Sequence, residues 1–220
     1  PSPDWALSSA AAMLKAQSGE GSISLVDIDP VAGPGAGLQI IDVQAAAGGV
    51  LVQSQGAVQV TKVRAAADSI VAIESGAGAL TLLGNDAVAA VSGAIGELTL
   101  AAAGVLTTSR IFTGSRRTEL RSGGSLALDF GSEAPATQAL VLHSDGSIEL
   151  AGDLASTLPI ELRAAEAINL VRRGASAGQA LDLSASAWTL ATRESGNSLS
   201  RLSIETGGDL SIAGAAAAAA

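Results

Sequence analysis

Residues 140–170 read LVLHSDGSIELAGDLASTLPIELRAAEAINL, and the pattern in this stretch decides the fold. A short unit is repeated in it: an apolar residue, one intervening residue, and a second apolar residue. Because side chains alternate between the two faces of a strand, the two apolar residues of each unit point the same way. The same unit occurs within the stretch and on both sides of it. Its pairs are Leu126/Leu128, Leu140/Leu142, Ile148/Leu150, Ile160/Leu162, Ile168/Leu170, Leu181/Leu183, Trp188/Leu190, Leu202/Ile204 and Leu210/Ile212.

The units form two interleaved series with a nearly fixed period of 20 to 22 residues. The first series is Leu142, Leu162, Leu183 and Ile204, and the second is Leu150, Leu170, Leu190 and Ile212. A fixed period of this length is typical of solenoid arrays, in which each unit is too short to bury its own apolar face and must stack on its copies. We therefore predict an all-β protein, a right-handed parallel β-solenoid (β-helix) with turns of about 20 residues. The two series would be its inward-facing core ladders.

The alternative fold is a globular β-sandwich built from many short strands. Sandwiches usually show turn signals every 8–12 residues and a larger share of aromatic residues in their strands. Here the spacing alternates between short and long, and the chain has only two Trp and two Phe, with no Tyr. The pattern favours the solenoid.

The two ends of the chain differ from the repeats. Residues 1–19 combine a possible helix cap at Ser2 with apolar residues at helical spacing, which predicts a short N-terminal helix. Such a helix would cover the open end of the solenoid, and the alternative is a linker from a preceding domain. Residues 20–214 are predicted to form the solenoid itself. Residues 215–220 are an unbroken alanine run that we treat as a tail of uncertain identity.

Composition excludes or disfavours several classes of function. The chain has no cysteine, which excludes disulfides, thiolate zinc sites and cysteine nucleophiles. Its net charge of −9 argues against nucleic acid as a partner, because binding phosphates requires clustered Lys and Arg. Apolar runs of membrane-spanning length are absent, so we expect no membrane insertion.

The densest positive charge lies in residues 109–121 and comprises Arg110, Arg116, Arg117 and Arg121. One interpretation is an assembly or docking patch for an acidic neighbouring subunit or an anionic glycan. The other is a solvated segment whose charges meet Glu119 and nearby acids. Charge is also uneven along the chain, with a net charge of −6 in residues 1–109 and −3 in residues 110–220, which would suit head-to-tail assembly.

Candidates for catalysis and metal binding are few. The single histidine, His143, has no second His or Cys with which to form a metal cluster or a catalytic triad. Glu149, Glu161 and Asp182 take the outward position of their units, and the last two are one period apart, so they could stack as a carboxylate pair. Such a pair is the only basis for a polysaccharide lyase or hydrolase site. We expect no enzyme, no catalytic residues, no cofactor and no metal.

Three units carry a family resemblance: GGSLALDF at residues 123–130, DGSIELAGDL at 145–154 and GGDLSIAG at 207–214. They resemble the degenerate repeats of bacterial filamentous-haemagglutinin-like exoproteins. The resemblance implies a right-handed parallel β-helix, exposed at the bacterial cell surface or secreted. It also implies a role in adhesion, matrix or filament building without catalysis.

These observations lead to a first expectation of function. The chain would be a non-enzymatic structural component of a bacterial extracellular filament, surface layer or giant adhesin, acting as a rigid rod. Its expected partners are copies of itself, in head-to-tail or lateral contact, with surface glycan as a further candidate. The alternative is a glycan-binding or receptor-binding segment of an adhesin or phage fibre, followed by a polysaccharide lyase or hydrolase.

Overall fold

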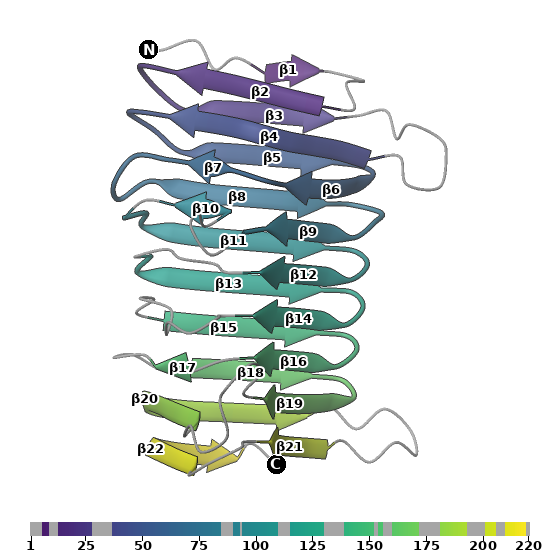
Figure 1. Cartoon of the computed structure of the whole chain (residues 1–220), viewed down its shortest axis with the longest axis vertical. Coiled ribbons are helices and arrows are strands. Elements are labelled where there is room, and N and C mark those ends of the chain that lie inside the picture. The colour runs from purple at the N-terminus through teal and green to yellow at the C-terminus, as the bar shows by residue number, and fades with distance from the viewer. Residues whose placement is uncertain are drawn as a thin grey trace.

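The chain folds into a stack of short parallel strands in the computed structural model (Figure 1). The structure describes residues 6–8, 13–27, 37–84, 90–92, 94–109, 115–129, 139–151, 154–155, 160–171, 181–192, 201–205 and 210–218. None of these residues is helical. The strands form two sheets, and every strand pair in them is parallel.

Sheet A holds one strand from each successive turn. In stacking order its strands are β1 (Ala6–Ser8), β3 (Ile23–Asp27), β5 (Val50–Ser54), β8 (Ile70–Ser75), β11 (Glu97–Ala102), β13 (Arg117–Ser122), β15 (Ala139–Ser144), β18 (Ile160–Ala164) and β20 (Leu181–Thr192), with β17 (Leu154–Ala155) and β22 (Leu210–Ala218) both paired to β20.

Sheet B receives the strand that follows in the same turn. Its strands in order are β10 (Val91–Ser92), β7 (Val63–Arg64), β4 (Gly37–Ala45), β6 (Ala57–Val60), β9 (Leu80–Leu83), β12 (Leu106–Ser109), β14 (Leu126–Asp129), β16 (Ile148–Ala151), β19 (Ala167–Val171) and β21 (Arg201–Glu205), with β2 (Met13–Ser18) paired to β4. The chain passes from one sheet to the other and back, so the predicted parallel β-solenoid is confirmed.

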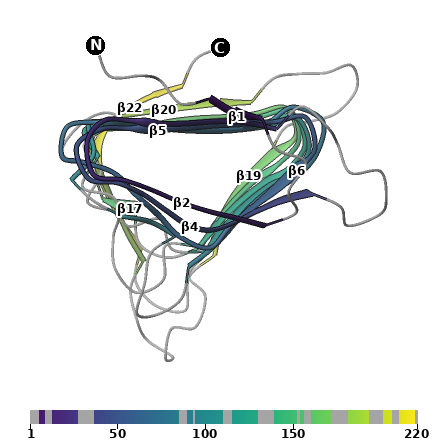
Figure 2. The ribbon, with the colours of Figure 1, turned by 90° about the horizontal axis from the view of Figure 1, so that it is seen from above.

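Seen along its axis, the solenoid has three sides (Figure 2). Sheet A forms one straight side, and the stacked strands of sheet B from β6 to β19 form the second. Strand β4 turns the corner to the third side, because residues 37–40 pair with β6 and residues 43–44 pair with β7. Three sides enclose a narrow interior that short runs of apolar side chains can fill.

The interior is built from the predicted apolar ladders. Of the predicted ladder residues, Leu142, Leu150 and Leu162 are almost fully buried. The ladders extend toward the N-terminus through residues of the same kind, among them Val52, Ile73, Leu100 and Leu120 in sheet A and Val60, Leu82 and Leu128 in sheet B. Side chains one turn apart lie about 4.8 Å from each other along the stack, so each buried residue packs on its equivalents in the turns before and after.

The predicted order of the ladders is wrong after Leu162 and Leu170. In the structure Leu162 lies opposite Leu190, and Leu170 lies opposite Ile204. Leu183 pairs instead with Leu154 and Ile212. The physical reason is that β20 is 12 residues long, so it carries two of the repeat units within one turn and the spacing from Leu162 to its partner is longer than the 20-residue period.

The predicted N-terminal helix is also wrong for the residues that the structure describes. Residues 6–8 form β1, which pairs with β3, and residues 13–18 form β2, which pairs with β4. Leu14 is buried whereas Met13 is exposed, the alternation of a strand. Alanine favours a helix, but an isolated helix of this length is only marginally stable in water. The edge of a solenoid turn offers free backbone groups, and pairing with them outweighs the helical preference.

Serine residues fill one corner of the solenoid at the end of sheet A. Ser54, Ser75, Ser122 and Ser144 occupy equivalent positions in the stack and are all buried, and Ala102 takes this position in the turn between Ser75 and Ser122. The hydroxyl of Ser144 donates to the carbonyl oxygen of Gly124 in the preceding turn (2.8 Å) and accepts from the N–H of Gly146 (3.1 Å). Each such serine thus ties its own corner to the turn below and satisfies backbone groups that the strands leave unpaired.

Candidate functional site

A regular surface is formed by the outward side of strands β3 to β18 in sheet A, which we call the outer face. Its strands are stacked in register, so outward side chains form straight columns across the turns. In chain order the outer face consists of Ser24, Val26, Leu51, Gln53, Ile70, Ala72, Glu74, Glu97, Thr99, Ala101, Arg117, Glu119, Arg121, Ala139, Val141, His143, Glu161 and Arg163.

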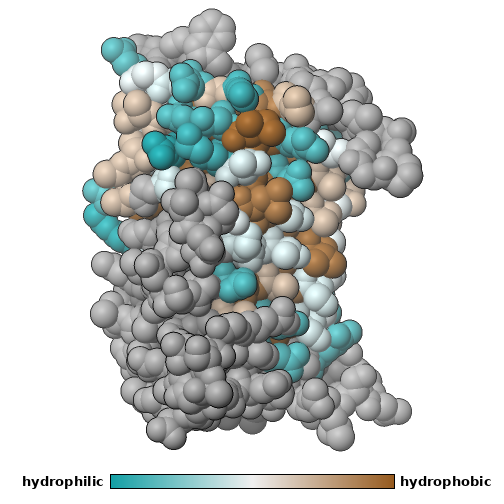
Figure 3. All heavy atoms as spheres, in the orientation of Figure 1, coloured by the Kyte–Doolittle hydropathy of each residue, from teal (hydrophilic) through white to brown (hydrophobic). Residues whose placement is uncertain are grey.

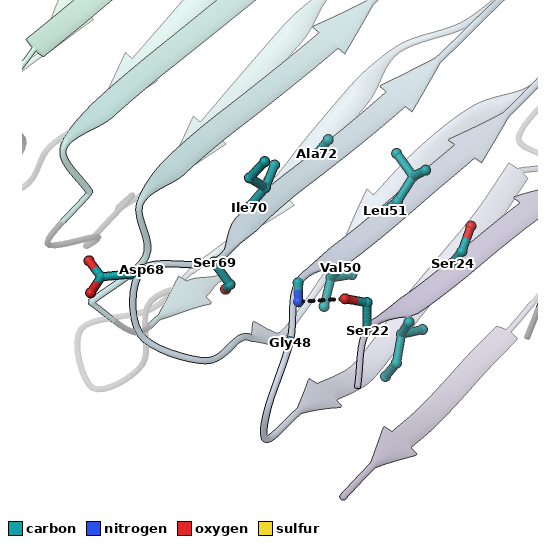
Figure 4. Close-up of a pocket in the computed structure, with 11 residues that line it drawn as sticks. Ser22, Ser24, Gly48, Val50, Leu51, Asp68, Ser69, Ile70 and Ala72 are labelled. Carbon is teal, nitrogen blue, oxygen red and sulfur yellow. Dashed lines mark hydrogen bonds between the residues drawn. The ribbon is translucent and has the colours of Figure 1, made fainter. Parts of the chain in front are cut away.

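A shallow groove of about 670 Å³ crosses the N-terminal part of the outer face (Figure 4). It lies over β3, β5 and β8, where Leu51 and Ile70 keep 39% and 57% of their surface exposed. Gly49 lies against Ile70 and keeps this part of the groove open because it has no side chain. A Cβ at Gly49 would meet the Ile70 carbonyl oxygen at 2.3 Å. The hydroxyl of Ser22 accepts a hydrogen bond from the N–H of Gly49 (3.1 Å) and fixes this edge of the groove.

The C-terminal part of the outer face carries a charged cluster centred on Glu119. Its carboxylate accepts hydrogen bonds from Arg117 (2.8 Å) and Arg121 (2.6 Å), which flank it on the same strand. Glu119 is only 8% exposed. Burial alone would raise the pKa of Glu119, but the hydrogen bond from Arg121 and the charges of Arg121, Arg117 and His143 outweigh it and hold the pKa below its usual range.

The cluster continues into the next two turns. His143 Nε2 lies 3.4 Å from Glu161 Oε1, and Arg163 forms an ion pair with the same carboxylate. Arg121, His143 and Arg163 are direct neighbours in one column of the register, so strands β13, β15 and β18 hold these groups side by side. The result is a partly neutralised basic surface.

The four arginines predicted as one patch lie in different places. Arg110 lies outside the described residues. Arg116 sits at a corner, where it binds Asp68 (2.5 Å), and both side chains of this pair are 66% exposed. Arg117 and Arg121 both bind Glu119 on the outer face. The described arginines therefore contact nearby acids, as expected if this segment is a solvated part of the surface. Their use as an assembly or docking patch stays a prediction.

The carboxylates considered for catalysis are not brought together. Glu149 lies on β16 in sheet B, opposite Ala127 and Asn169, whereas Glu161 lies on β18 in sheet A. In the register, Glu161 is opposite Val141 and Thr189. Asp182 is opposite Ser211, so the expected stacking of Glu161 on Asp182 is wrong. The cause is again the long β20, which shifts Asp182 away from the column of Glu161.

A second polar cluster, on the third side of the solenoid, was missed by the sequence argument. Asp42 on β4 accepts hydrogen bonds from Lys62 (2.9 Å) in the following turn and from Gln44 (2.8 Å) on its own strand. Burial tends to raise the pKa of Asp42, but these hydrogen bonds and the charges of Lys62 and Arg64 bring it below its usual range. The signal was available, since Asp42 and Lys62 are one 20-residue period apart.

The rest of the surface formed by the described residues shows no further cluster that suggests a binding site. On the side of sheet B, hydrophobic residues are separated by polar ones (Figure 3), an arrangement that is ordinary for a protein surface. Within the described ranges there is no group of three or more His, Asp or Glu that could hold a metal ion. No helix long and apolar enough to cross a bilayer occurs in that part of the chain either.

No family model matches the chain, and neither a curated protein nor a solved structure gives a significant match. The fold itself fits a structural or adhesin-like repeat protein.

Proposed function

We propose that this chain is a non-enzymatic structural segment of a bacterial extracellular filament, surface layer or giant adhesin. It would act as a rigid rod that associates with copies of itself at the cell surface. The exoprotein repeats that its sequence units resemble are the nearest analogy for this role. The observation that carries the proposal is the continuous pair of in-register sheets, whose buried ladders run from turn to turn.

Two further features support a mechanical role. Repeat stacks gain their stability from contacts between neighbouring turns, so a long stack is stiff along its axis and presents the same kind of surface at every turn. The serine corner adds hydrogen bonds between turns, as in Ser122 to Gly104 (2.8 Å) and Ser144 to Gly124 (2.8 Å). Separated carboxylates, with Glu149 and Glu161 on different sheets, offer no support for a lyase or hydrolase.

Sedimentation velocity of the purified chain over a concentration series tests self-association directly. The proposal predicts a weight-average mass that rises with concentration and falls on dilution. A single monomeric species at every concentration would remove self-association from the proposal.

A second candidate function is binding of a surface glycan or receptor. The groove over β3, β5 and β8 favours it, because Leu51 and Ile70 provide apolar contacts beside the hydroxyls of Ser22, Ser24 and Ser69. Screening the chain against immobilised glycans tests it, with Ala72→Arg as the variant that fills the groove. Binding that Ala72→Arg abolishes would support this role, and absence of binding to any glycan would count against it.

A further inference from the structure

The outer face is divided by charge into two halves. Strands β3, β5, β8 and β11 present two outward acids, Glu74 and Glu97, and no outward Lys or Arg. Strands β13, β15 and β18 present three arginines, two glutamates and His143, an excess of at least one positive charge. The two halves are of similar size and lie on either side of the boundary between β11 and β13.

We infer that the outer face is the contact surface between two copies of this chain, paired face to face with their solenoid axes antiparallel. The inference rests on the proposed self-association and names the surface that carries it. A two-fold axis that lies in the face along the strand direction reverses the order of the turns and keeps each residue's place along its strand. The acidic half of one copy therefore meets the basic half of the other, which is a self-complementary arrangement.

The register shows which residues such an axis brings together. With the axis between β11 and β13, strand β11 faces β13 of the second copy, and β8 faces β15. Arg117 then lies opposite Glu97, since the two are direct neighbours in one column. His143 lies opposite Glu74, since both belong to the column of Ala101.

The opposite orientation is disfavoured by the same charges. A two-fold axis parallel to the solenoid axis would place each turn opposite the same turn of the second copy. The acidic half, with Glu74 and Glu97, would then face the acidic half of the second copy, and the arginines would face arginines. Like charges opposed across an interface disfavour the contact. The charge pattern thus selects antiparallel pairing, whereas the net charges of the two chain halves had suggested head-to-tail contact.

The size and chemistry of the face fit a reversible dimer. Seven strands spaced about 4.8 Å apart, with five or six residues of about 3.3 Å each, cover roughly 500–650 Å² per copy. Stable interfaces bury about 800 Å² per partner, so this one belongs with weaker, concentration-dependent contacts. Leu51 and Ile70 are the two large hydrophobic residues left exposed on the face, and both would be covered.

Two matched substitutions test the inference. Thr99 lies outward at the centre of the face on β11, and Thr107 lies outward on β12 in sheet B. Thr99→Arg should block the contact sterically and weaken the dimer at least tenfold in sedimentation velocity. Thr107→Arg should leave the dissociation constant unchanged. Circular dichroism and thermal melting of both variants establish that each is folded.

Crosslinking gives an independent readout because the chain has no cysteine of its own. Thr99→Cys, placed near the two-fold axis, should be captured as a covalent dimer by a short thiol-to-thiol crosslinker, and Thr107→Cys should stay monomeric. If the folded Thr99→Arg variant associates as the unmodified chain does, or if Thr107→Cys crosslinks in preference, the outer face is not the interface although self-association stands. If the unmodified chain stays monomeric throughout, the proposed self-association fails together with this inference.

Discussion

Two buried threonines, one in each sheet, show how single residues affect the stability of the buried ladders. Thr118 takes an inward position on β13, and its hydroxyl lies 2.6 Å from the Ser115 hydroxyl. Thr108 takes an inward position on β12, and its hydroxyl is buried without a hydrogen-bond partner. A buried hydroxyl without a partner costs free energy that a methyl group of the same shape does not.

Thr108→Val should therefore raise the free energy of unfolding by about 1 kcal/mol. Leu82 and Leu128 are its neighbours in the column, so an apolar side chain suits the site. Thermal melting followed by circular dichroism measures the change, which should be an increase of a few degrees in Tm. Thr118→Val is the matched control and should lower Tm, because it breaks an existing hydrogen bond; an equal effect of both substitutions would contradict the argument.

Glu119 makes stability depend on pH at the acid end. Its pKa in the folded state is lowered, so its contribution to stability is fully present above the unfolded pKa of about 4.3 and is lost as the pH falls through the folded pKa. Glu119→Gln should lower stability at pH 7 by about 1–3 kcal/mol, because Arg117 and Arg121 lose their carboxylate. It should also flatten the loss of stability below pH 4.5.

Chemical denaturation at pH 7 and at pH 3 measures both effects of Glu119→Gln. The double variant Glu119→Gln/Arg121→Gln is the control, and its cost at pH 7 should be less than the sum of the two single costs, since the groups interact. A pH profile of Glu119→Gln that coincides with that of the unmodified chain would exclude this ion pair as a source of acid sensitivity.

At the scale of the strand, alternation between faces decides which positions tolerate charge. Leu100 and Ala101 are neighbours on β11, with Leu100 fully buried in the ladder and Ala101 on the outer face. Leu100→Asp should abolish the cooperative thermal transition, because it places an unpaired charge in the core. Ala101→Asp should melt within a few degrees of the unmodified chain, and equal melting of the two variants would contradict the assignment of faces.

At the corners, close approach of adjacent turns selects glycine. Gly123 follows the corner serine Ser122, and a Cβ there would meet the Ala103 carbonyl oxygen at 2.3 Å. Gly123→Ala should therefore destabilise the protein by more than about 1 kcal/mol. Gly76 holds the equivalent place after Ser75, but its nearest neighbour is at 3.4 Å, so Gly76→Ala should change Tm little. Denaturant titration of the two variants side by side checks the difference.

The period and alternation of the strands decide which parts of the fold can be predicted from the sequence. Period and alternation were enough for the parallel solenoid and for the burial of Leu142, Leu150 and Leu162, because stacked turns repeat the same packing requirement. They failed after Leu170, where β20 holds two units in one turn. They also failed at residues 6–8 and 13–18, where pairing with β3 and β4 decides the structure and no local signal reports that pairing.

The groove could not be predicted from sequence for a related reason. It depends on Ser24, Leu51 and Ala72 being adjacent, yet these residues are separated by 27 and 21 positions, so no fixed period aligns them. The ion pairs of Glu119 with Arg117 and Arg121 are different, because residues two apart on a strand share a face and the sequence alone indicates the contact.

The molecule as a whole is a stiff stack whose flat outer face is divided by charge. Its buried ladders supply stability, and its corners join each turn to the next through hydrogen bonds. The outward columns are free to carry function, because they contribute little to the core. Association with a second copy through the outer face is the use of these columns that the charge pattern favours.

Negative-stain electron microscopy of the purified chain over a concentration series tests this account most directly. We predict short rods at low concentration and, as the concentration rises, a growing fraction of rods paired side by side or joined into ordered assemblies. Compact particles without an elongated axis would contradict the rod, and isolated rods at every concentration would contradict its role as a self-associating structural element.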